Sequence, residues 1–389
     1  MAKWIENLID IFSRGIPTKP IPSGIFHYQS TPESEIPYRL HLRLEEDGTG
    51  ILIINAHTSL HLNQTAAEYA YYIVQGFTEE QVLVEITQRY SIKKVQAASD
   101  YQNLLENIHL LATSEDVDPV SFLDFDREEL YPSNLSAPYR LDCALTYRSS
   151  GQEDINAPME RVKRELLTDE WKSILSKAWH AGIPHIIFTG GEPTTRPDLP
   201  ELISYAQSLG QVAGLLTNGF RLSDHKYFHD LLNGGLDHVM ILLDPLESQS
   251  WEAVRDVLAE DIFLTVHITL DNKSAKDAIK TIDRLIKMGV KHLSITIQHP
   301  ELRLRMDEVT NYAASQGLNL IWDIPVPYSS FNTFRMDVED ENIAAGAGTG
   351  WLYVEPDGDV LPGQGINRVL GNLLMNNWNE IWSNRKATS

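Results

Sequence analysis

The chain has very little cysteine, little positive charge and no long hydrophobic run, and each shortage excludes a class of protein. Its 389 residues include one cysteine, Cys143. One thiol excludes an intramolecular disulfide framework and any zinc or iron–sulfur site that takes several thiolates from this chain. The chain has 32 Lys and Arg against 54 Asp and Glu, a net charge of −22. This balance argues against a nucleic-acid partner and against an anionic membrane surface.

Membrane-spanning and secreted proteins are also disfavoured. No stretch reaches about 18 consecutive apolar residues, the length that a transmembrane helix needs. The N-terminus lacks the basic start, apolar run and small-residue cleavage site of a signal peptide. We therefore expect a soluble, cytoplasmic protein. A hydrophobic content of 42% is sufficient for packed cores, and the length suggests two or three domains.

The first 113 residues predict a lead helix and a small α+β domain. Residues 2–13 place apolar side chains at helical spacing, and this helix packs on its own protein or, alternatively, docks on a partner or a membrane surface. Prolines then end it, so residues 1–22 form a lead segment. Residues 23–113 follow as one domain, with a capping box at Thr78 and Gln81. Its predicted strands are Arg39–Leu44, Gly50–Asn55 and Leu60–Leu62, and its predicted helices are Ala66–Gln75, Glu79–Tyr90 and Val95–Ala112.

An acidic linker at residues 114–136 separates this domain from a β–α repeat. Residues 115–130 carry seven acids against one base, a composition typical of a solvated linker. From 137 to 325, strands and helices alternate, which predicts an α/β fold of parallel strands with crossover helices. A partial or full barrel fits this pattern, and a doubly wound sheet is the alternative. The predicted strands are Leu141–Thr146, Ile186–Thr189, Ala213–Thr217, His238–Leu243, Leu264–Leu270, Leu293–Ile297 and Leu318–Ile324. The predicted helices are Asp169–Ala181, Leu199–Leu209, His225–Leu232, Trp251–Leu258, Ala278–Met288 and Leu302–Gln316.

The most specific motif follows the second of these strands, at residues 188–193, and reads Phe-Thr-Gly-Gly-Glu-Pro. Ligands bind at the carboxyl ends of parallel strands, and Gly190 and Gly191 let a ligand approach the backbone closely. Glu192 is suited to accept a hydrogen bond from a ligand ammonium group. The alternative is a tight strand–helix turn in which Pro193 opens the next segment.

Two further strand ends accompany this motif. Residues 145–148 read Leu-Thr-Tyr-Arg, and residues 216–219 read Leu-Thr-Asn-Gly. In this order the motifs resemble the radical S-adenosylmethionine (SAM) superfamily, over roughly residues 137–325. The resemblance implies a partial (β/α)6 barrel, three cysteines that hold a 4Fe–4S cluster, and SAM bound at the open iron. It also implies that Gly190, Gly191, Glu192, Pro193 and Asn218 form the SAM site.

The chain departs from this family where the cluster would bind. The three cysteine positions align with Ser149, Glu153 and Asn156, and none of these is a thiolate. Because such clusters are held chiefly by cysteine thiolates, we expect no 4Fe–4S cluster, no radical chemistry and at most a vestigial or weak SAM site. Cys143 lies before the loop and is expected to pack in the core. The varied replacements suggest natural degeneration.

The regions on either side resemble further parts of this family. Residues 354–362 and 370–373, with a helix near Trp382, resemble a SPASM/twitch extension, so residues 326–389 predict a hairpin and a helix without the auxiliary-cluster cysteines. Residues 62–68 and 76–81 resemble a PqqD-like domain, a winged-helix-like fold that binds a leader peptide as an added strand. A DNA-binding winged helix is the alternative, and the acidic balance disfavours it.

Histidines offer a weaker pattern. Five lie near predicted strands, where a lone histidine is usually a hydrogen-bonded core residue. If two or three converged with Asp244 or Glu192, they would form a metal site. Asp237 and Asp244 lie near the fourth strand, where the superfamily often has polar ligand contacts. The five histidines are His185, His238, His267, His292 and His299.

The favoured hypothesis is a cluster-less radical SAM-like protein, a pseudoenzyme that binds a peptide or a partner protein in a peptide-modification (RiPP-type) pathway. Two alternatives remain. The first is an enzyme that uses the barrel mouth to bind SAM or a metal without radical chemistry. The second is a structural subunit of a homo- or hetero-oligomer.

Overall fold

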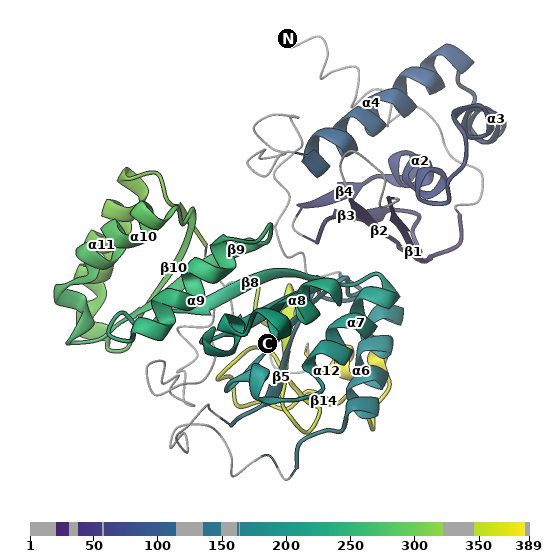
Figure 1. The fold of residues 1–389 in the computed structure, drawn as a ribbon. Helices are drawn as coiled ribbons and strands as arrows, with labels where there is room; N and C mark the ends of the chain where they lie inside the picture. Colours follow the sequence, from purple (N-terminus) through teal and green to yellow (C-terminus); the bar gives the residue numbers. More distant parts are fainter. Residues whose placement is uncertain are drawn as a thin grey trace. The chain divides into compact units, whose positions relative to one another are not determined.

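The computed structural model describes residues 21–30, 38–56, 58–113, 135–148, 162, 164–321 and 346–385. The predicted lead helix, most of the acidic linker and the loop after Arg148 lie outside these residues. The chain divides into two compact units, which are described separately: unit 1 holds residues 1–136 and 180–184, and unit 2 holds residues 137–179 and 185–389 (Figure 1). No helix in the described ranges is long and apolar enough to cross a membrane.

Unit 1 contains an antiparallel sheet of four strands in the order β1-β2-β3-β4. The three predicted strands are confirmed. Strand β1 was not predicted, and it pairs with β2 from Gly24 opposite Leu44 to Gln29 opposite Arg39. A turn at Gly48, with φ of +86°, joins β2 to β3. The strands are β1 (Gly24–Gln29), β2 (Arg39–Leu44), β3 (Gly50–Ile54) and β4 (Thr58–Leu62).

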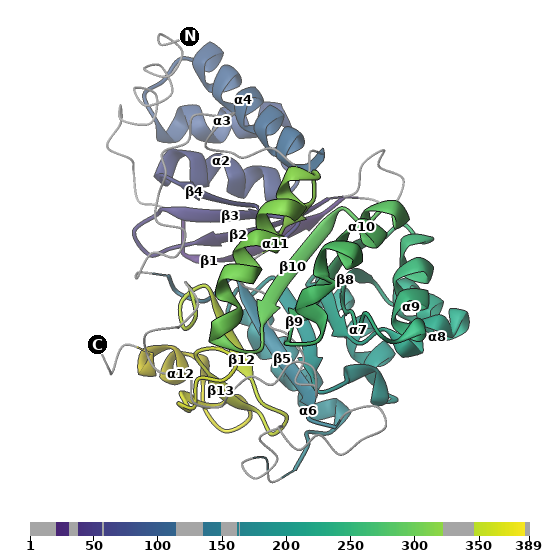
Figure 2. The ribbon, with the colours of Figure 1, turned by 90° about the vertical axis from the view of Figure 1, so that its left-hand side faces the viewer.

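Three helices follow this sheet, as predicted, and Figures 1 and 2 show α2 and α4 on one of its faces. The predicted capping box is confirmed, because Thr78 Oγ1 accepts from Gln81 N and Gln81 Oε1 accepts from Thr78 N. Apolar side chains of the strands and of α2 and α4 form one buried cluster, which includes Leu42, Leu52 and Ala70. The helices are α2 (Gln64–Val74), α3 (Glu79–Arg89) and α4 (Lys94–Thr113).

Unit 2 is built on a sheet whose strands β5 to β11 are parallel and follow one another in chain order. A doubly wound sheet reverses its strand order at one point, so this alternative is wrong. Six predicted strands are confirmed within two residues, and β11 is described only as Asn319–Leu320. The strands are β5 (Arg140–Thr146), β6 (His185–Gly190), β7 (Val212–Thr217), β8 (Leu236–Leu242), β9 (Phe263–Leu270), β10 (His292–Ile297) and β11.

The helices of unit 2 lie between these strands, and all six agree with the predicted ranges within three residues. They are α6 (Thr168–His180), α7 (Leu199–Leu209), α8 (His225–Asn233), α9 (Ser248–Leu258), α10 (Ala278–Met288) and α11 (Arg303–Ser315).

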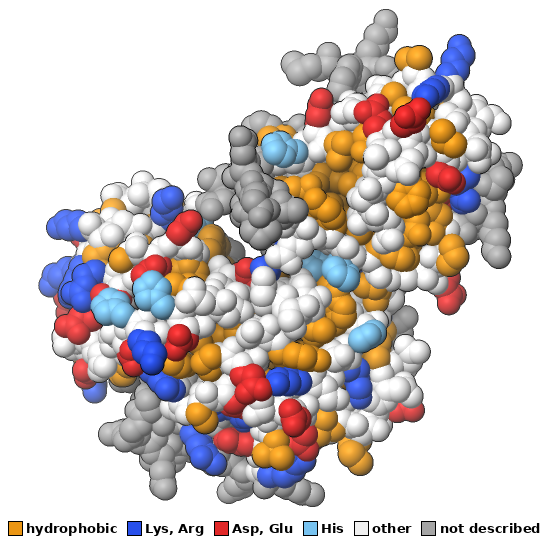
Figure 3. All heavy atoms as spheres, turned by 45° about the vertical axis from the view of Figure 1, so that its right-hand side comes forward, with side chains coloured by type: hydrophobic (Ala, Val, Ile, Leu, Met, Phe, Trp, Pro, Cys, Tyr) orange, Lys and Arg blue, Asp and Glu red, His pale blue; other side chains and the backbone are white. Residues whose placement is uncertain are grey.

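Acidic and basic side chains are interspersed on the face of the molecule that Figure 3 shows.

Side chains that alternate along the strands give the two faces of the sheet different chemistry. One face carries residues such as Cys143, Phe188 and Leu215, all fully buried. The pairing places Asp142, Ile187, Gly214 and His238 in one row on the other face. The second face also carries Arg140, His185, Thr189, His267 and Ser294. We call it the polar face.

The C-terminal segment continues this sheet. Strand β12 (Trp351–Val354) pairs in parallel with β5, and β13 (Asp359–Leu361) pairs with β12 as an antiparallel hairpin, as Figure 2 shows. A short β14 (Gly371–Asn372), which was not predicted, extends the edge. The predicted helix is present as α12 (Trp378–Asn384). The hairpin therefore packs as a part of unit 2.

Candidate functional site

The glycines of the Gly-Gly-Glu-Pro motif bring the ends of β5 and β6 into close contact. The Gly191 N–H donates to the Thr146 carbonyl at 2.7 Å, and the Glu192 N–H donates to the Arg148 carbonyl at 2.8 Å. A Cβ atom on Gly190 would overlap the Thr146 carbonyl oxygen, and one on Gly191 would overlap that of Arg148. Gly190 also has φ of +119°. The close approach that these glycines permit is therefore used by the backbone of β5.

The Glu192 carboxylate connects the end of β6 to the end of β7. Oε1 accepts from Thr194 N at 3.0 Å and from the hydroxyls of Thr194 and Thr217 at 2.6 and 2.7 Å. Oε2 accepts from Asn218 N at 2.8 Å. The side chain is 3% exposed. Burial raises the pKa of this carboxyl group, and the hydrogen bonds act in the opposite direction.

The remaining predicted SAM-site residues lie at the same edge of the sheet. Pro193 is the first residue of a 3-10 turn, Pro193–Thr195, for which Glu192 is the N-terminal cap. The Asn218 side chain accepts from Phe220 N at 3.0 Å, and Gly219 has φ of +79°. The structure thus supports the turn interpretation of the motif and also places the predicted residues side by side.

Three threonines at this edge were not singled out in the sequence, although Thr189 and Thr217 belong to quoted motifs and Thr194 directly follows one. Thr194 and Thr217 hold the Glu192 carboxylate. Thr189 lies on the polar face, is fully buried, and its hydroxyl has no hydrogen-bond partner among the described residues. A buried hydroxyl without a partner is unfavourable, so Thr189 marks a position where a ligand atom would be accepted. The signal in the sequence was a hydroxyl residue directly before Gly190, directly before Asn218 and directly after Pro193.

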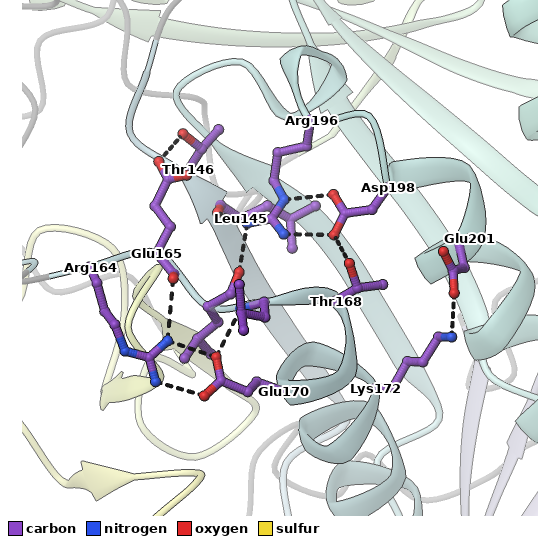
Figure 4. A network of polar contacts seen from close by, with 12 residues as sticks. Leu145, Thr146, Arg164, Glu165, Thr168, Glu170, Lys172, Arg196, Asp198 and Glu201 are labelled. Atoms are coloured by element: carbon purple, nitrogen blue, oxygen red, sulfur yellow. Dashed lines mark hydrogen bonds and ion pairs between the residues drawn. The ribbon is translucent and has the colours of Figure 1, made fainter.

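A network of hydrogen bonds and ion pairs holds the carboxyl end of β5 (Figure 4). Arg196 donates Nη1 to the carbonyls of Leu145 and Leu166 at 3.1 and 3.0 Å, and forms a two-point ion pair with Asp198. Glu165 accepts from the Thr146 hydroxyl at 2.5 Å. These contacts hold the strand end from which the loop after Arg148 departs.

The residues of this chain do not fit a 4Fe–4S cluster. Ser149, Glu153 and Asn156 lie outside the described residues, and their side chains supply no thiolate in any arrangement. Cys143 is fully buried within β5, and burial raises the pKa of its thiol. The prediction that it packs in the core is confirmed, and a protonated buried thiol is not a metal ligand.

The structure brings two of the five histidines together, and neither meets Asp244 or Glu192. His185 and His238 meet each other, with their Nε2 atoms 2.7 Å apart. His267 instead contacts the hydroxyls of Ser294, Thr269 and Thr296. The ring of His292 lies 4.3 Å from that of Phe263 and is tilted by 36°, and His299 directly precedes a 3-10 turn. Asp237 accepts from Ala213 N, and Asp244 accepts from Leu246 N.

Among the described residues, one group of three side chains lies close enough together to hold a metal ion. It lies at the turn between β12 and β13 and consists of Glu355, Asp357 and Asp359. Glu355 is buried and accepts from the Tyr147 hydroxyl at 3.1 Å, while Asp359 accepts from Asn372. Glu355 therefore ties the hairpin to the residue that follows β5, and Asp359 ties it to β14.

Comparison with known proteins agrees with the resemblance seen in the motifs. Residues 143–263 match the model of the radical SAM superfamily. A PqqA peptide cyclase of Streptomyces rochei is 34% identical over 153 residues, which cover 36% of this chain and 42% of that protein. A PqqA peptide cyclase of Bradyrhizobium diazoefficiens is 38% identical over 239 residues, which cover 55% of this chain and 62% of that protein. Both matches span less than two thirds of the relative.

Solved structures show the same fold. The crystal structure of SuiB from Streptococcus suis has a TM-score of 0.56 and 17% sequence identity, and the match covers 93% of this chain and 88% of that one. SuiB has also been solved bound to S-adenosylmethionine and bound to the precursor peptide SuiA. Residues 143–263 therefore form a radical SAM superfamily domain, related in sequence to PqqA peptide cyclases and similar in fold to SuiB.

Proposed function

We propose that this protein is a cluster-less radical SAM-like pseudoenzyme that binds a peptide or a partner protein in a peptide-modification pathway. The observation that carries the proposal is the single thiol of the chain, Cys143, buried in the middle of β5. Reductive cleavage of SAM requires the electron and the open iron that a 4Fe–4S cluster supplies. Without three thiolates the chain keeps the scaffold and loses that chemistry.

The proposal assigns a part to each segment of the scaffold. Unit 1 is a PqqD-like domain, the parallel sheet of unit 2 forms a partial (β/α)6 barrel, and the hairpin β12–β13 with α12 is a degenerate SPASM/twitch extension. The names of the relatives support the pathway: two are PqqA peptide cyclases, and SuiB has been solved with a precursor peptide.

Within unit 1, the peptide would bind along β4. In the described sheet, β1 pairs with β2 at one edge and β4 pairs with β3 at the opposite edge. An edge strand presents backbone groups to which an extended peptide adds as a further strand. Both β1 and β4 are edge strands of this sheet, and the proposal takes β4 as the edge that binds the peptide.

Anaerobic reconstitution with iron and sulfide tests the absence of the cluster. The wild-type protein is expected to form no stoichiometric 4Fe–4S spectrum and no 5′-deoxyadenosine from SAM. The matched variant Ser149→Cys/Glu153→Cys/Asn156→Cys restores the three thiols and is expected to gain the cluster. A stoichiometric cluster in the wild-type protein would overturn the proposal.

Hydrogen exchange with a synthetic PqqA peptide as the probe tests the peptide. We expect binding in the micromolar range, about −8 kcal/mol, and slowed exchange in Thr58–Leu62 but not in Gly24–Gln29. Strand β1, Gly24–Gln29, serves as the internal control, because it is the other edge of the same sheet. Absence of binding, or protection confined to β1, would contradict this part.

Thr189 favours a second candidate function, the binding of SAM without radical chemistry. Its buried hydroxyl is directed to the polar face beside the Gly-Gly-Glu-Pro motif and has no partner in the described part of the chain. Calorimetric titration with SAM tests this, with Thr189→Val as the variant. A dissociation constant below millimolar that weakens in the variant supports the candidate. No heat at millimolar SAM leaves the motif as a structural turn.

A further inference from the structure

Two histidine rings meet at the amino end of the parallel sheet, the end opposite Glu192. His185 is the first residue of β6 and His238 is the third residue of β8. Their Nε2 atoms are 2.7 Å apart, and the rings cross at 69° with centroids 4.9 Å apart. Strand β7 lies between β6 and β8, so the two side chains reach across a whole strand.

Gly214 of β7 is the reason that they can meet. It pairs with Ile187 on one side and with His238 on the other, so any side chain there would lie on the polar face. A Cβ atom at this position would overlap Cε1 and Nε2 of His238. The backbone of Gly214 is not in the left-handed region, so the glycine is required here for space and not for its conformation.

Each imidazole can offer a nitrogen to a metal ion. A neutral imidazole carries one N–H and keeps one nitrogen lone pair, which is the form that binds metals. The hydrogen bond across 2.7 Å needs only one Nε2 proton, and transfer of that proton to Nδ1 leaves both Nε2 atoms as ligands.

The neighbouring charges cancel. Arg140 donates Nε to Asp142 Oδ1 at 2.7 Å and Nη2 to Oδ2 at 3.2 Å, and its guanidinium lies 4.9 Å from the Trp351 ring. Because the Arg140 charge is paired with Asp142, its repulsion of a cation at the histidines is reduced. The pair is thus a nitrogen-donor site beside an ion-paired arginine, in a chain with a net charge of −22.

We propose that His185 and His238 bind a divalent transition-metal ion, Zn²⁺ or Cu²⁺, across Gly214 at the amino end of the sheet. Two imidazoles at 2.0–2.1 Å in tetrahedral geometry place their nitrogens about 3.3 Å apart, so the pair must open by about 0.6 Å. Side-chain rotation provides this. Imidazole favours Zn²⁺ and Cu²⁺ over Mg²⁺ and Ca²⁺, and water completes the coordination. The site is separate from the proposed peptide and SAM sites and does not depend on them.

Metal titration of the full chain tests the site. We expect one equivalent of Zn²⁺ to bind with a micromolar dissociation constant, and His238→Gln and His185→Gln each to weaken it at least tenfold. The matched control is His229→Gln, which removes a half-exposed histidine on α8 and is expected to leave this equivalent unchanged. Equal stoichiometry and affinity in the wild-type protein and His238→Gln, or binding weaker than millimolar, would overturn the proposal.

Electron paramagnetic resonance of bound Cu²⁺ gives an independent measurement. Two equivalent nitrogen ligands are expected in the wild-type protein and a different spectrum in His238→Gln. Gly214→Ala leaves both histidines in the chain but fills the space in which they meet, so it is expected to lose the two-nitrogen signal. If Gly214→Ala does not fold, the two histidine variants still decide the question. A two-nitrogen signal that persists in His238→Gln contradicts the assignment.

Discussion

The two ends of strand β6 are built in the same way and serve different purposes. At the carboxyl end, Gly190 and Gly191 have no side chains, so the backbones of β5 and β6 can touch. Near the amino end, Gly214 of the neighbouring strand β7 has no side chain, so two imidazoles can touch. Four donors of the chain occupy the Glu192 carboxylate. At the amino end, the Nε2 atoms of His185 and His238 lie 2.7 Å apart.

The difference shows that the Gly-Gly-Glu-Pro motif has a structural role here, whereas the two histidines are the better candidates for binding. A buried carboxylate with four hydrogen bonds joins two strand ends and is fully explained by the fold. The two imidazoles meet where Gly214 carries no side chain, and their nitrogens remain suited to bind a metal ion. The carboxyl end is therefore expected to respond to mutation chiefly in stability, and the amino end chiefly in protonation and metal binding.

The largest effect is expected for Gly191→Ala. The new Cβ would overlap the Arg148 carbonyl oxygen and lie 2.8 Å from the Tyr147 carbonyl carbon, both of them backbone atoms. We expect the free energy of unfolding to fall by about 4 kcal/mol or more, or the protein not to fold. The control Gly289→Ala has φ of +95° and open space, and is expected to cost about 1–2 kcal/mol. Equal melting temperatures for the two variants would show that the strand ends are not tightly joined.

The pH dependence separates the charges at the amino end. Burial raises the pKa of Asp142 from 3.8 to about 6, with Arg140 opposing, so its contribution is complete below pH 3.8 and lost as the pH rises through 6. The pKa of His238 is lowered from 6.5 to about 4, so its contribution is complete above pH 6.5 and lost as the pH falls through 4. Each shift corresponds to about 3 kcal/mol.

Because these contributions have opposite slopes, they largely cancel between pH 4 and 6 in the wild-type protein. Single variants expose them, as measured by denaturant unfolding at pH 4.5 and 6.5. We expect His238→Gln to lose stability relative to the wild type as the pH rises, and Asp142→Asn to gain it. Two variants that both follow the wild-type pH profile would show that neither group titrates in this range.

Glu192→Gln is expected to lower the free energy of unfolding by about 2 kcal/mol. In the wild-type protein both carboxylate oxygens accept hydrogen bonds. In the variant the amide NH2 group replaces one of these oxygens and faces a donor, so at least one buried hydrogen bond is lost. Glu201→Gln is the control, because Glu201 is 59% exposed and pairs with Lys172 at the surface, where the change is expected to stay within about 0.5 kcal/mol. A neutral Glu192→Gln would mean that the carboxylate does not join the strand ends.

The smallest effect is expected for Thr189→Val, which removes a buried hydroxyl without a partner in the described residues. Stability is expected to stay equal or to rise by up to about 1 kcal/mol, as measured by thermal unfolding. Thr217→Val removes a hydroxyl that donates to Glu192 and is expected to cost about 1 kcal/mol. A loss in Thr189→Val as large as that in Thr217→Val would show that Thr189 has a partner in the ligand-free protein.

Most helices and strands were predictable because their periodicity is local. Leu199–Leu209 and Ala278–Met288 end where the sequence indicates, each before a glycine in the left-handed region. Strand β1 was missed because its residues are only partly buried and alternate weakly. Strand β14 has two residues and exists through its pairing with β13.

The candidate site was predictable in its location but not in its contacts. The motifs place Glu192 and Asn218 at neighbouring strand ends, and the structure confirms this. That the two residues bond to each other, and that Thr189 is left without a partner, depends on side-chain distances that no motif specifies. The alternative in which histidines converge with Asp244 or Glu192 is not observed: His185 and His238 lie toward the amino ends of their strands, and the two carboxylates accept from local donors.

By itself the sequence determined the α/β class, the order of the elements and the lack of thiolates beyond Cys143, because composition and local periodicity are properties of the chain alone. The tertiary structure decided that the strands follow in chain order, that the hairpin joins β5, and that His185 meets His238 across Gly214. These features depend on register between strands far apart in the sequence, which periodicity does not encode.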